Sequence, residues 1–204
     1  MNNIIDLQYV GNIYWFNKLV NLKHVIFLSS EPYRKMSFRN RAVVAGSNGT
    51  INLSVPLQSG RNQKSGYGEI KISYSQAWQA NQWQTIISCY SKSPFFEYYR
   101  HGLQPFFTQK TEFLFAHNLT ILDWLIKIMK LPVTYEVAVP EDIISGKLND
   151  LRDDILPKNY QNIKGFPVYP QVFQDRIGFI PNLSILDLLF NTGPQAADIL
   201  NHIP

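Results

Sequence analysis

Residues 3–28 have the sequence NIIDLQYVGNIYWFNKLVNLKHVIFL, and this stretch decides the fold. Residues 3–9 and 24–28 are predicted to be short strands, because apolar and β-favouring residues dominate both runs. Between them, apolar residues recur at the spacing of one helix face: Ile13, Trp15, Phe16, Leu19 and Val20. A strand, a helix and a strand in succession predict a βαβ-like opening.

A β-hairpin is predicted after this opening. Residues 41–44 and 51–55 flank Ser47-Asn48-Gly49, and Asn-Gly between two β-rich runs is a strong hairpin signal. Pro56 ends the second strand, since proline has no N–H to donate to a ladder. Residues 70–74 alternate apolar and polar side chains and predict a further strand.

The middle of the chain is predicted to be helical. Ser75 is placed to cap a first helix through its hydroxyl. A second helix is expected over residues 95–107, and a third begins near Thr111 and ends before Pro132. The apolar face of the first helix is expected to lie in the interior and includes Trp78, Gln82, Ile86 and Tyr90.

The last third of the chain mixes short elements. Residues 133–139 and 173–180 predict strands, and residues 184–200 predict a final helix. Residues 140–165 predict a loop with one helical turn near 150–155. We therefore expect one mixed α/β or α+β domain over residues 1–204, with helices flanking a central β-sheet. Its strands are expected near residues 4, 26, 42, 53 and 72.

The composition is typical of a folded cytoplasmic protein. Hydrophobic residues make up 45% of the 204 residues and charged residues 17%, as in globular chains. Cys89 is the only cysteine, which excludes an internal disulfide and fits a reducing compartment. The sequence has no signal-peptide pattern and no apolar window of the ~20 residues that cross a bilayer. A cytoplasmic protein without a membrane span is expected.

The net charge of +4 favours anionic ligands but is common among soluble proteins, so nucleic acid is not an expected partner. The densest basic segment is residues 34–41, RKMSFRNR. If its end is extended, Arg39 and Arg41 project from one face and can hold a phosphate or carboxylate. In the alternative interpretation the segment is structural. The arginines then pair with acids that lie beside apolar runs: Asp6, Glu31 and Asp187.

Asp187 has two interpretations. It follows Ser184 by three residues, which is the spacing of a capping box at a helix start, and it is also a candidate for a binding site. The residues predicted to bind a ligand are Arg34, Lys35, Arg39, Asn40, Arg41 and Asp187.

Catalytic residues and a cofactor are not identified by the sequence. Glycine-rich nucleotide loops and a Gly-x-Ser-x-Gly elbow are absent. The histidines lack ligand spacing, so no metal site is expected. His117 and Cys89 are expected to have structural roles within helices.

Short motifs run along the chain: YRKMSFRNR at residues 33–41, LSVP at 53–56, Trp78, YSKSPFF at 90–96, PVYPQ at 167–171 and SILDLLFNTGP at 184–194. In this order they resemble the motifs of the WbqC-like family, collinearly from about residue 5 to residue 200. Residues 6–12, DLQYVGN, lack the His-Gln-Pro pattern with which many members open. Residues 140–165 are also shorter than the middle segment of longer members, so the chain resembles a compact branch.

The resemblance implies a role in the biosynthesis of cell-surface polysaccharide such as O-antigen. One hypothesis is a group transferase acting on a nucleotide- or lipid-linked sugar, whose anionic part the basic residues hold. The alternative is a non-catalytic protein that binds a polysaccharide precursor or a partner enzyme of the pathway. In both hypotheses the expected small-molecule partner is a phosphate-bearing or sugar ligand.

Overall fold

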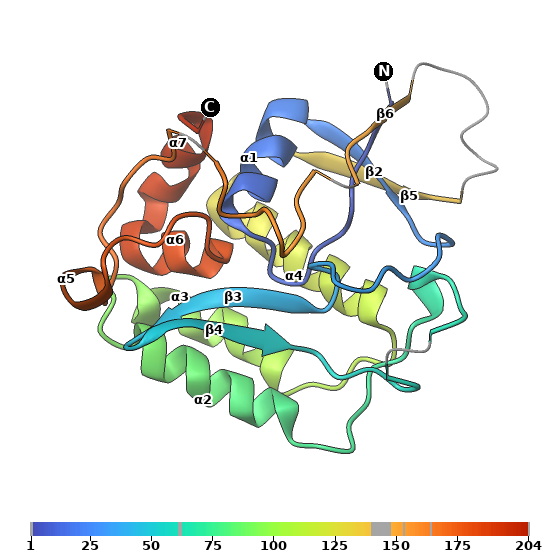
Figure 1. The fold of residues 1–204 in the computed structure, drawn as a ribbon, viewed down its shortest axis with the longest axis horizontal. Helices are drawn as coiled ribbons and strands as arrows, with labels where there is room; N and C mark the ends of the chain where they lie inside the picture. Colours follow the sequence, from blue (N-terminus) through green and yellow to red (C-terminus); the bar gives the residue numbers. More distant parts are fainter. Residues whose placement is uncertain (1, 61–62, 140–147, 153, 164, 204) are drawn as a thin grey trace.

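The computed structural model of this chain describes residues 2–60, 63–139, 148–152, 154–163 and 165–203. Within these residues, parallel strands form a four-stranded sheet in the order β5-β2-β1-β6 (Figure 1). α1 (Ile13–Leu22) connects two neighbouring strands of this sheet, so the βαβ opening is confirmed. The first strand ends at Ile4 and not at residue 9, so it is shorter than predicted. The strands are β1 (Asn2–Ile4), β2 (His24–Leu28), β5 (Thr134–Ala138) and β6 (Leu148–Asp150).

β2 is buried on both faces, as is typical of an inner parallel strand. Successive side chains point to opposite faces of a sheet. Val25 and Phe27 therefore enter the main core, whereas Ile26 and Leu28 pack with Ile4 in a smaller cluster. This two-sided burial explains why the strand consists almost entirely of apolar residues.

β3 (Arg41–Gly46) and β4 (Gly49–Ser54) form an antiparallel hairpin with a two-residue turn, as predicted. Gly49 adopts a φ of +122°, which side-chain-bearing residues rarely take, so glycine is required at this turn. The hairpin is a sheet of its own. The prediction that strands near residues 42 and 53 join the central sheet is therefore wrong, and β5 and β6 take part instead.

The strand predicted over residues 70–74 is not formed. Ile70 and Ile72 are buried, but only isolated bridges link Lys71 to Phe113 and Ile72 to Leu57. The apolar alternation arises because an irregular segment buries every second side chain, without a strand ladder. The central sheet therefore has no strand near residue 72.

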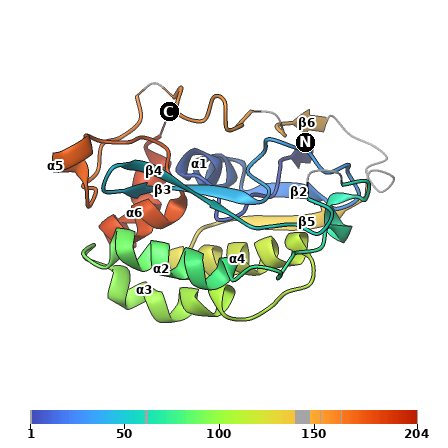
Figure 2. The ribbon, with the colours of Figure 1, turned by 60° about the horizontal axis from the view of Figure 1, so that its bottom comes forward.

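Three helices cover one side of the two sheets, and α1 lies on the opposite side (Figure 2). They are α2 (Trp78–Tyr90), α3 (Phe96–Leu103) and α4 (Leu114–Met129). Trp78, Ile86 and Tyr90 are buried, as predicted. The predicted cap is wrong, because Ala77 precedes α2 without a side-chain hydrogen bond and Ser75 bonds to Ser73. Two short 3-10 helices accompany this layer: η1 (Tyr67–Glu69) and η2 (Gln104–Phe107).

The carboxyl-terminal elements differ from the prediction. The strand expected over residues 173–180 is replaced by α5 (Gln174–Ile177), because Gln174 Oε1 accepts from the Gln171 N–H and starts a tight turn. The predicted final helix is broken at Gly193, where φ is +55° and a Cβ would overlap the Phe95 ring. It becomes α6 (Ile185–Thr192), η4 (Gly193–Gln195) and α7 (Ala196–Asn201).

The predicted loop at residues 140–165 is described only in part. Residues 140–147, 153 and 164 lie outside the described residues. Of the helical turn predicted at 150–155, Asp150 belongs to β6, and the other described residues are not helical. The mixed α/β class is confirmed, and one large core cluster joins the helices, the hairpin and the inner face of the sheet.

Candidate anion-binding site

The basic segment divides between two environments. Arg39 faces a cluster of carboxylates, whereas Lys35, Asn40 and Arg41 line a pocket. The prediction that Arg39 and Arg41 project from one face is wrong. β3 begins only at Arg41, so the alternation of a strand does not extend back to Arg39.

Arg39 has a structural role, which was the alternative interpretation of the sequence. Its side chain is 1% exposed. Its Nη2 donates to Asp6 Oδ1 at 2.6 Å and to Glu31 Oε1 at 2.5 Å, and its Nη1 donates to the Pro32 carbonyl at 3.1 Å. A buried guanidinium that binds two carboxylates holds the chain ahead of β3 against the core.

A second arginine completes this cluster. Arg152 Nη1 donates to Glu31 Oε2 at 2.8 Å, and Arg152 also binds Asp150. The pKa of Asp150 is lowered, chiefly by its hydrogen bond from Arg152 and in small part by the charge of Arg34. Burial raises the pKa of Glu31, while the charges of Arg39 and Arg152 oppose this rise. Arg34 therefore lies near the acidic cluster, and it is not among the residues that line the pocket.

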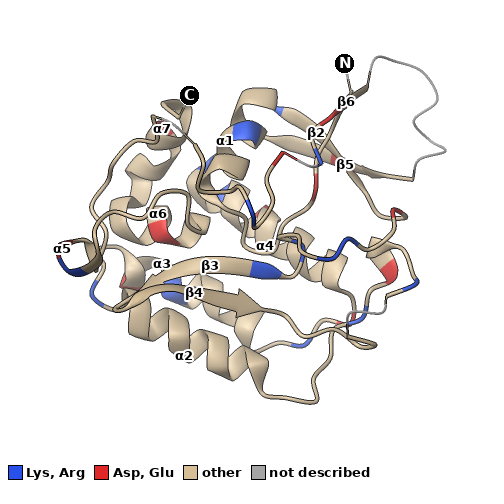
Figure 3. Cartoon of the chain, in the orientation of Figure 1, with Lys and Arg blue, Asp and Glu red and all other residues tan. Residues whose placement is uncertain are grey.

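The rest of the segment borders a cavity of about 520 Å³. It lies between residues 33–41, the end of β4 and the start of α2, and Figure 3 marks the basic position that begins β3. Cationic, amide, phenolic and indole groups thus share one concave surface. Its lining includes Tyr33, Lys35, Asn40, Arg41, Gln76 and Trp78.

Arg41 is the half-buried cation of this pocket. It starts β3 opposite Ser54 in the hairpin. Within the described part of the chain, no carboxylate pairs with Arg41 or Lys35. The Nε of Arg41 is also a buried donor with no partner among these residues. An anionic ligand can satisfy such a donor, and an unsatisfied buried donor costs about 1–3 kcal/mol.

Asn40 fixes one wall of the pocket. Its Nδ2 donates to the Val55 carbonyl at 3.0 Å, and its Oδ1 accepts from the Tyr33 hydroxyl at 2.9 Å. Burial raises the pKa of Tyr33, although the charges of Arg39 and Arg41 oppose this rise. The phenol therefore stays protonated at neutral pH, and Asn40 orients it.

Buried aromatic rings lie behind the pocket. Trp78 makes an edge-on contact with His117 at a centroid distance of 6.0 Å, and Tyr9 stacks on His117 at 5.9 Å. Burial lowers the pKa of His117 to about 4, so its ring is neutral at pH 7. Neither Trp78 Nε1 nor His117 Nε2 has a hydrogen-bond partner among the described residues.

Asp187 belongs to a separate buried cluster, on α6 (Figure 3). Its Oδ1 accepts from the Tyr90 hydroxyl at 2.9 Å, and its Oδ2 accepts from Tyr169 at 2.6 Å and Gln171 at 2.9 Å. Burial raises the pKa of this carboxyl to about 6, and the three hydrogen bonds act in the opposite direction. Asp187 does not line the basic pocket, and its role in ligand binding stays a prediction.

Of the two parts of the predicted capping box, the Ser184 cap is confirmed and the role of the Asp187 carboxylate is wrong. Ser184 Oγ accepts from the Leu186 N–H at 3.4 Å and caps α6, as predicted. The carboxylate does not reach back to the helix start, because three neutral donors hold it in the core. Cys89 is buried nearby, and burial raises the pKa of its thiol to about 11, which agrees with a structural role.

Sequence reasoning missed how the pocket is completed. Trp78 was placed on a buried helix face, but not beside Arg41, and Gln76 was not considered. Tyr33 immediately precedes the basic segment, and an aromatic residue beside clustered cations is a signal that points to a ligand surface.

The described residues form neither a metal-ligand cluster nor a membrane-spanning helix. Among them, no group of three or more His, Cys, Asp and Glu side chains is arranged to hold a metal ion. No helix formed by these residues has both the length and the apolar character needed to cross a bilayer.

Comparison with known proteins identifies a family. No curated protein and no solved structure matches the chain. The WbqC-like protein family matches residues 8–156 and 147–199, which cover the hairpin, the basic segment, the helical layer and α6. The resemblance of the motifs is thereby confirmed over most of the chain. The chain belongs to the WbqC-like protein family.

Proposed function

We propose that this protein takes part in the biosynthesis of cell-surface polysaccharide by binding a phosphate-bearing sugar precursor in the basic pocket. Membership of the WbqC-like family supports the proposal, because this family is loosely associated with polysaccharide biosynthesis. The observation that carries the proposal is that Arg41 and Lys35 lack carboxylate partners among the described residues and share a cavity with Tyr33 and Trp78.

The pocket has groups for each part of such a ligand. Arg41 and Lys35 supply charge-assisted donors for phosphate oxygens, and the Tyr33 hydroxyl sits next to them. Trp78 contributes an aromatic wall for a sugar or a base. The volume of about 520 Å³ falls within the range of roughly 300–1,000 Å³ that is usual for small-molecule sites. A nucleotide-linked or lipid-linked sugar, available in the cytoplasm, has the matching chemistry.

A second candidate is transfer of an acyl or similar group to the bound sugar. The observation that favours it is His117, whose neutral imidazole contacts Trp78 behind the pocket and keeps an unpartnered Nε2. A neutral imidazole can accept the proton of an attacking hydroxyl. Binding remains the first candidate, because His117 is only 1% exposed and Trp78 lines the pocket in its place.

A thermal-shift screen tests the binding proposal. Nucleotide sugars, sugar 1-phosphates and acyl-CoA are added separately, and a ligand that binds only the folded state raises the melting temperature. Calorimetry on any hit then compares wild type with Arg41→Gln. Loss of one charge-assisted hydrogen bond is expected to weaken binding by about 1.5–3 kcal/mol, with little change in fold stability.

Arg176→Gln is the matched control. Arg176 is exposed, binds the neutral Asn48 side chain at 2.9 Å and lies outside the pocket, so its loss removes the same charge. It should leave the affinity unchanged. The proposal is wrong if no compound moves the midpoint, or if Arg41→Gln and Arg176→Gln bind equally well. Mass spectrometry of mixtures of acyl-CoA and sugar then detects or excludes group transfer.

A further inference from the structure

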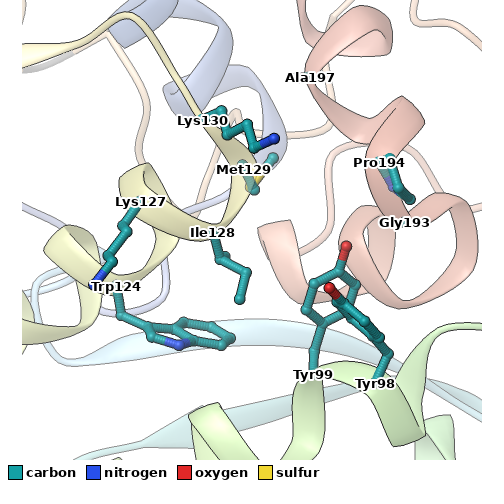
Figure 4. Close-up of a pocket in the computed structure, with 10 residues that line it drawn as sticks. All are labelled: Tyr98, Tyr99, Trp124, Lys127, Ile128, Met129, Lys130, Gly193, Pro194 and Ala197. Atoms are coloured by element: carbon teal, nitrogen blue, oxygen red, sulfur yellow. The ribbon is translucent and has the colours of Figure 1, made fainter.

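A second cavity, of about 530 Å³, lies where the end of α4 meets α3 and η4 (Figure 4). It shares no lining residue with the basic pocket. Trp124 forms one wall, and Tyr98 and Tyr99 stand opposite it. Ile128 projects into the space between these aromatic walls.

Tyr99 is a buried residue with an unused polar atom. The residue is 4% exposed, and its hydroxyl, which makes no hydrogen bond within the described part of the chain, is accessible from the cavity. Figure 4 shows this hydroxyl directed into the cavity, next to that of Tyr98. The two rings contact edge to face at 4.8 Å. Burial raises the pKa of Tyr99, so its phenol remains a donor at neutral pH.

Trp124 keeps its indole at the cavity because α3 leaves room for it. A Cβ at Gly102 would lie 2.8 Å from Trp124 Nε1, so any larger residue there would displace the ring. Phe106 packs against the indole at a centroid distance of 5.8 Å and fixes its tilt. Trp15, Trp78 and Trp83 are buried, whereas Trp124 is half-buried and exposes a flat apolar surface.

Lys130 is the cation at the rim of this cavity. It ends α4 in the left-handed conformation, with φ 52° and ψ 41°, where glycine or asparagine is the usual residue. Figure 4 shows its ammonium directed toward the space above the tyrosines. No carboxylate among the described residues pairs with Lys127 or Lys130. Its ammonium is therefore available to an anionic group of a ligand in the cavity.

We propose that this cavity binds a carboxylate-bearing saccharide unit. The apolar C–H face of a sugar ring packs on Trp124, its hydroxyls bond to the phenols of Tyr98 and Tyr99, and its carboxylate binds Lys130. The two phenol hydroxyls opposite the indole can bond to several hydroxyls of a polyhydroxylated ring. The inference does not depend on the basic pocket, because the two sites share no residues.

Calorimetry with defined oligosaccharides tests the inference on the full chain. The probes are a hyaluronan tetrasaccharide, which carries glucuronate, uncharged, fully N-acetylated chitotetraose of the same length, and uridine monophosphate. The acidic tetrasaccharide is expected to bind at least about tenfold more tightly than chitotetraose, the effect of one charge-assisted hydrogen bond. Binding should also quench tryptophan fluorescence, and Trp124→Phe should remove that quenching.

Lys130→Gly is the decisive variant. Glycine accepts the left-handed backbone, so the fold should be at least as stable, while affinity for the acidic tetrasaccharide falls about tenfold. Lys23→Gly is its matched control, because Lys23 is an exposed lysine that ends α1 at a φ of 62°, outside the cavity. It should leave binding unchanged. Tyr99→Phe, which removes only the hydroxyl, should weaken both saccharides alike.

Three outcomes with the saccharide probes overturn the inference. They are no binding of the acidic tetrasaccharide, equal affinity for both tetrasaccharides, or equal losses in Lys130→Gly and Lys23→Gly. Tighter binding of uridine monophosphate, lost in Lys130→Gly, assigns the cavity to nucleotides instead. Because Arg41→Gln does not touch this cavity, it should bind the acidic tetrasaccharide normally, so failure of one site is distinguishable from failure of the other.

Discussion

Asp187, Asp6 and Glu31 are all buried, but their charges are compensated in different ways. Asp6 and Glu31 bind the guanidinium of Arg39. Asp187 accepts hydrogen bonds from two phenols and one amide, and no cation of the described residues pairs with it. The first cluster depends on an opposite charge. The second depends on neutral donors and gains from being protonated.

The largest expected effect is that of removing the opposite charge. Arg39→Met leaves two neighbouring buried carboxylates without their shared guanidinium, and it should destabilise the fold by about 3–5 kcal/mol. Urea unfolding at pH 7 measures this loss. The triple variant with Asp6→Asn and Glu31→Gln should recover part of the stability, because the uncompensated charges are then gone.

Arg100→Met is the control for the loss of an arginine as such. Arg100 binds Glu97 in a largely exposed pair on α3, and such pairs contribute only about 0–1 kcal/mol. If Arg39→Met and Arg100→Met unfold at the same urea concentration, the Arg39 cluster does not hold the core and the contrast between the two clusters fails.

The second prediction concerns the pH dependence of the Asp187 cluster. Folding raises the pKa of Asp187 from 3.8 to about 6, so the folded state binds the proton more tightly than the unfolded chain. The stability that protonation provides is complete below pH 3.8 and is lost as the pH rises through 6. A rise of about 2 pKa units corresponds to about 3 kcal/mol across this window.

Asp187→Asn removes this titration. The difference in unfolding free energy between wild type and Asp187→Asn should therefore change by about 3 kcal/mol between pH 3.5 and pH 7. Wild type should become less stable relative to the variant as the pH rises. Asp123→Asn is the matched control, since Asp123 accepts a hydrogen bond from Tyr135 at an exposed position. A flat difference for Asp187→Asn would show that the carboxyl is not protonated on folding.

The smallest expected effect is that of one neutral donor. Tyr169→Phe deletes a hydrogen bond of 2.6 Å to the carboxylate and should cost about 1.5–3 kcal/mol at pH 7. At pH 4 the cost should fall toward about 1 kcal/mol, because a protonated Asp187 is a weaker acceptor.

Tyr67→Phe is the comparison for this variant. The Tyr67 hydroxyl is equally buried and donates to the neutral Leu7 carbonyl at 2.9 Å. Its deletion should cost the same at both pH values. An equal cost of Tyr169→Phe at pH 4 and pH 7 would contradict the neutral-donor account of the cluster.

The contrast also shows how far sequence reasoning reaches. A pairing of the arginines with Asp6 and Glu31 was the alternative interpretation, because an acid beside an apolar run needs a partner, and Arg39 provides it. The same alternative named Asp187 as a possible partner of an arginine, and no arginine among the described residues pairs with it. Its partners Tyr90 and Tyr169 are 97 and 18 positions away, and no local spacing marks a phenol as a hydrogen-bond donor.

The elements of the fold also divide into those that the sequence predicted and those that it did not. The β3–β4 hairpin, α1 and α4 were predicted, because each is specified by neighbouring residues. Which strands share a sheet was not, since β1, β2, β5 and β6 pair across long separations. The basic pocket was predicted only as a row of cations. Its aromatic wall, Trp78, comes from a helix that the sequence separates from Arg41 by the whole hairpin.

The placement of β6 beside β1 sets the order in which the chain acquires its structure. Asn3 and Asn149 face each other in this pair although 146 positions separate them, whereas the hairpin closes within residues 41–54. Contacts between distant segments form slowly, because a long loop must close first. The edge of β1 that β6 covers can therefore be paired only once residues 148–150 have been synthesised, whereas the hairpin needs only residues 41–54.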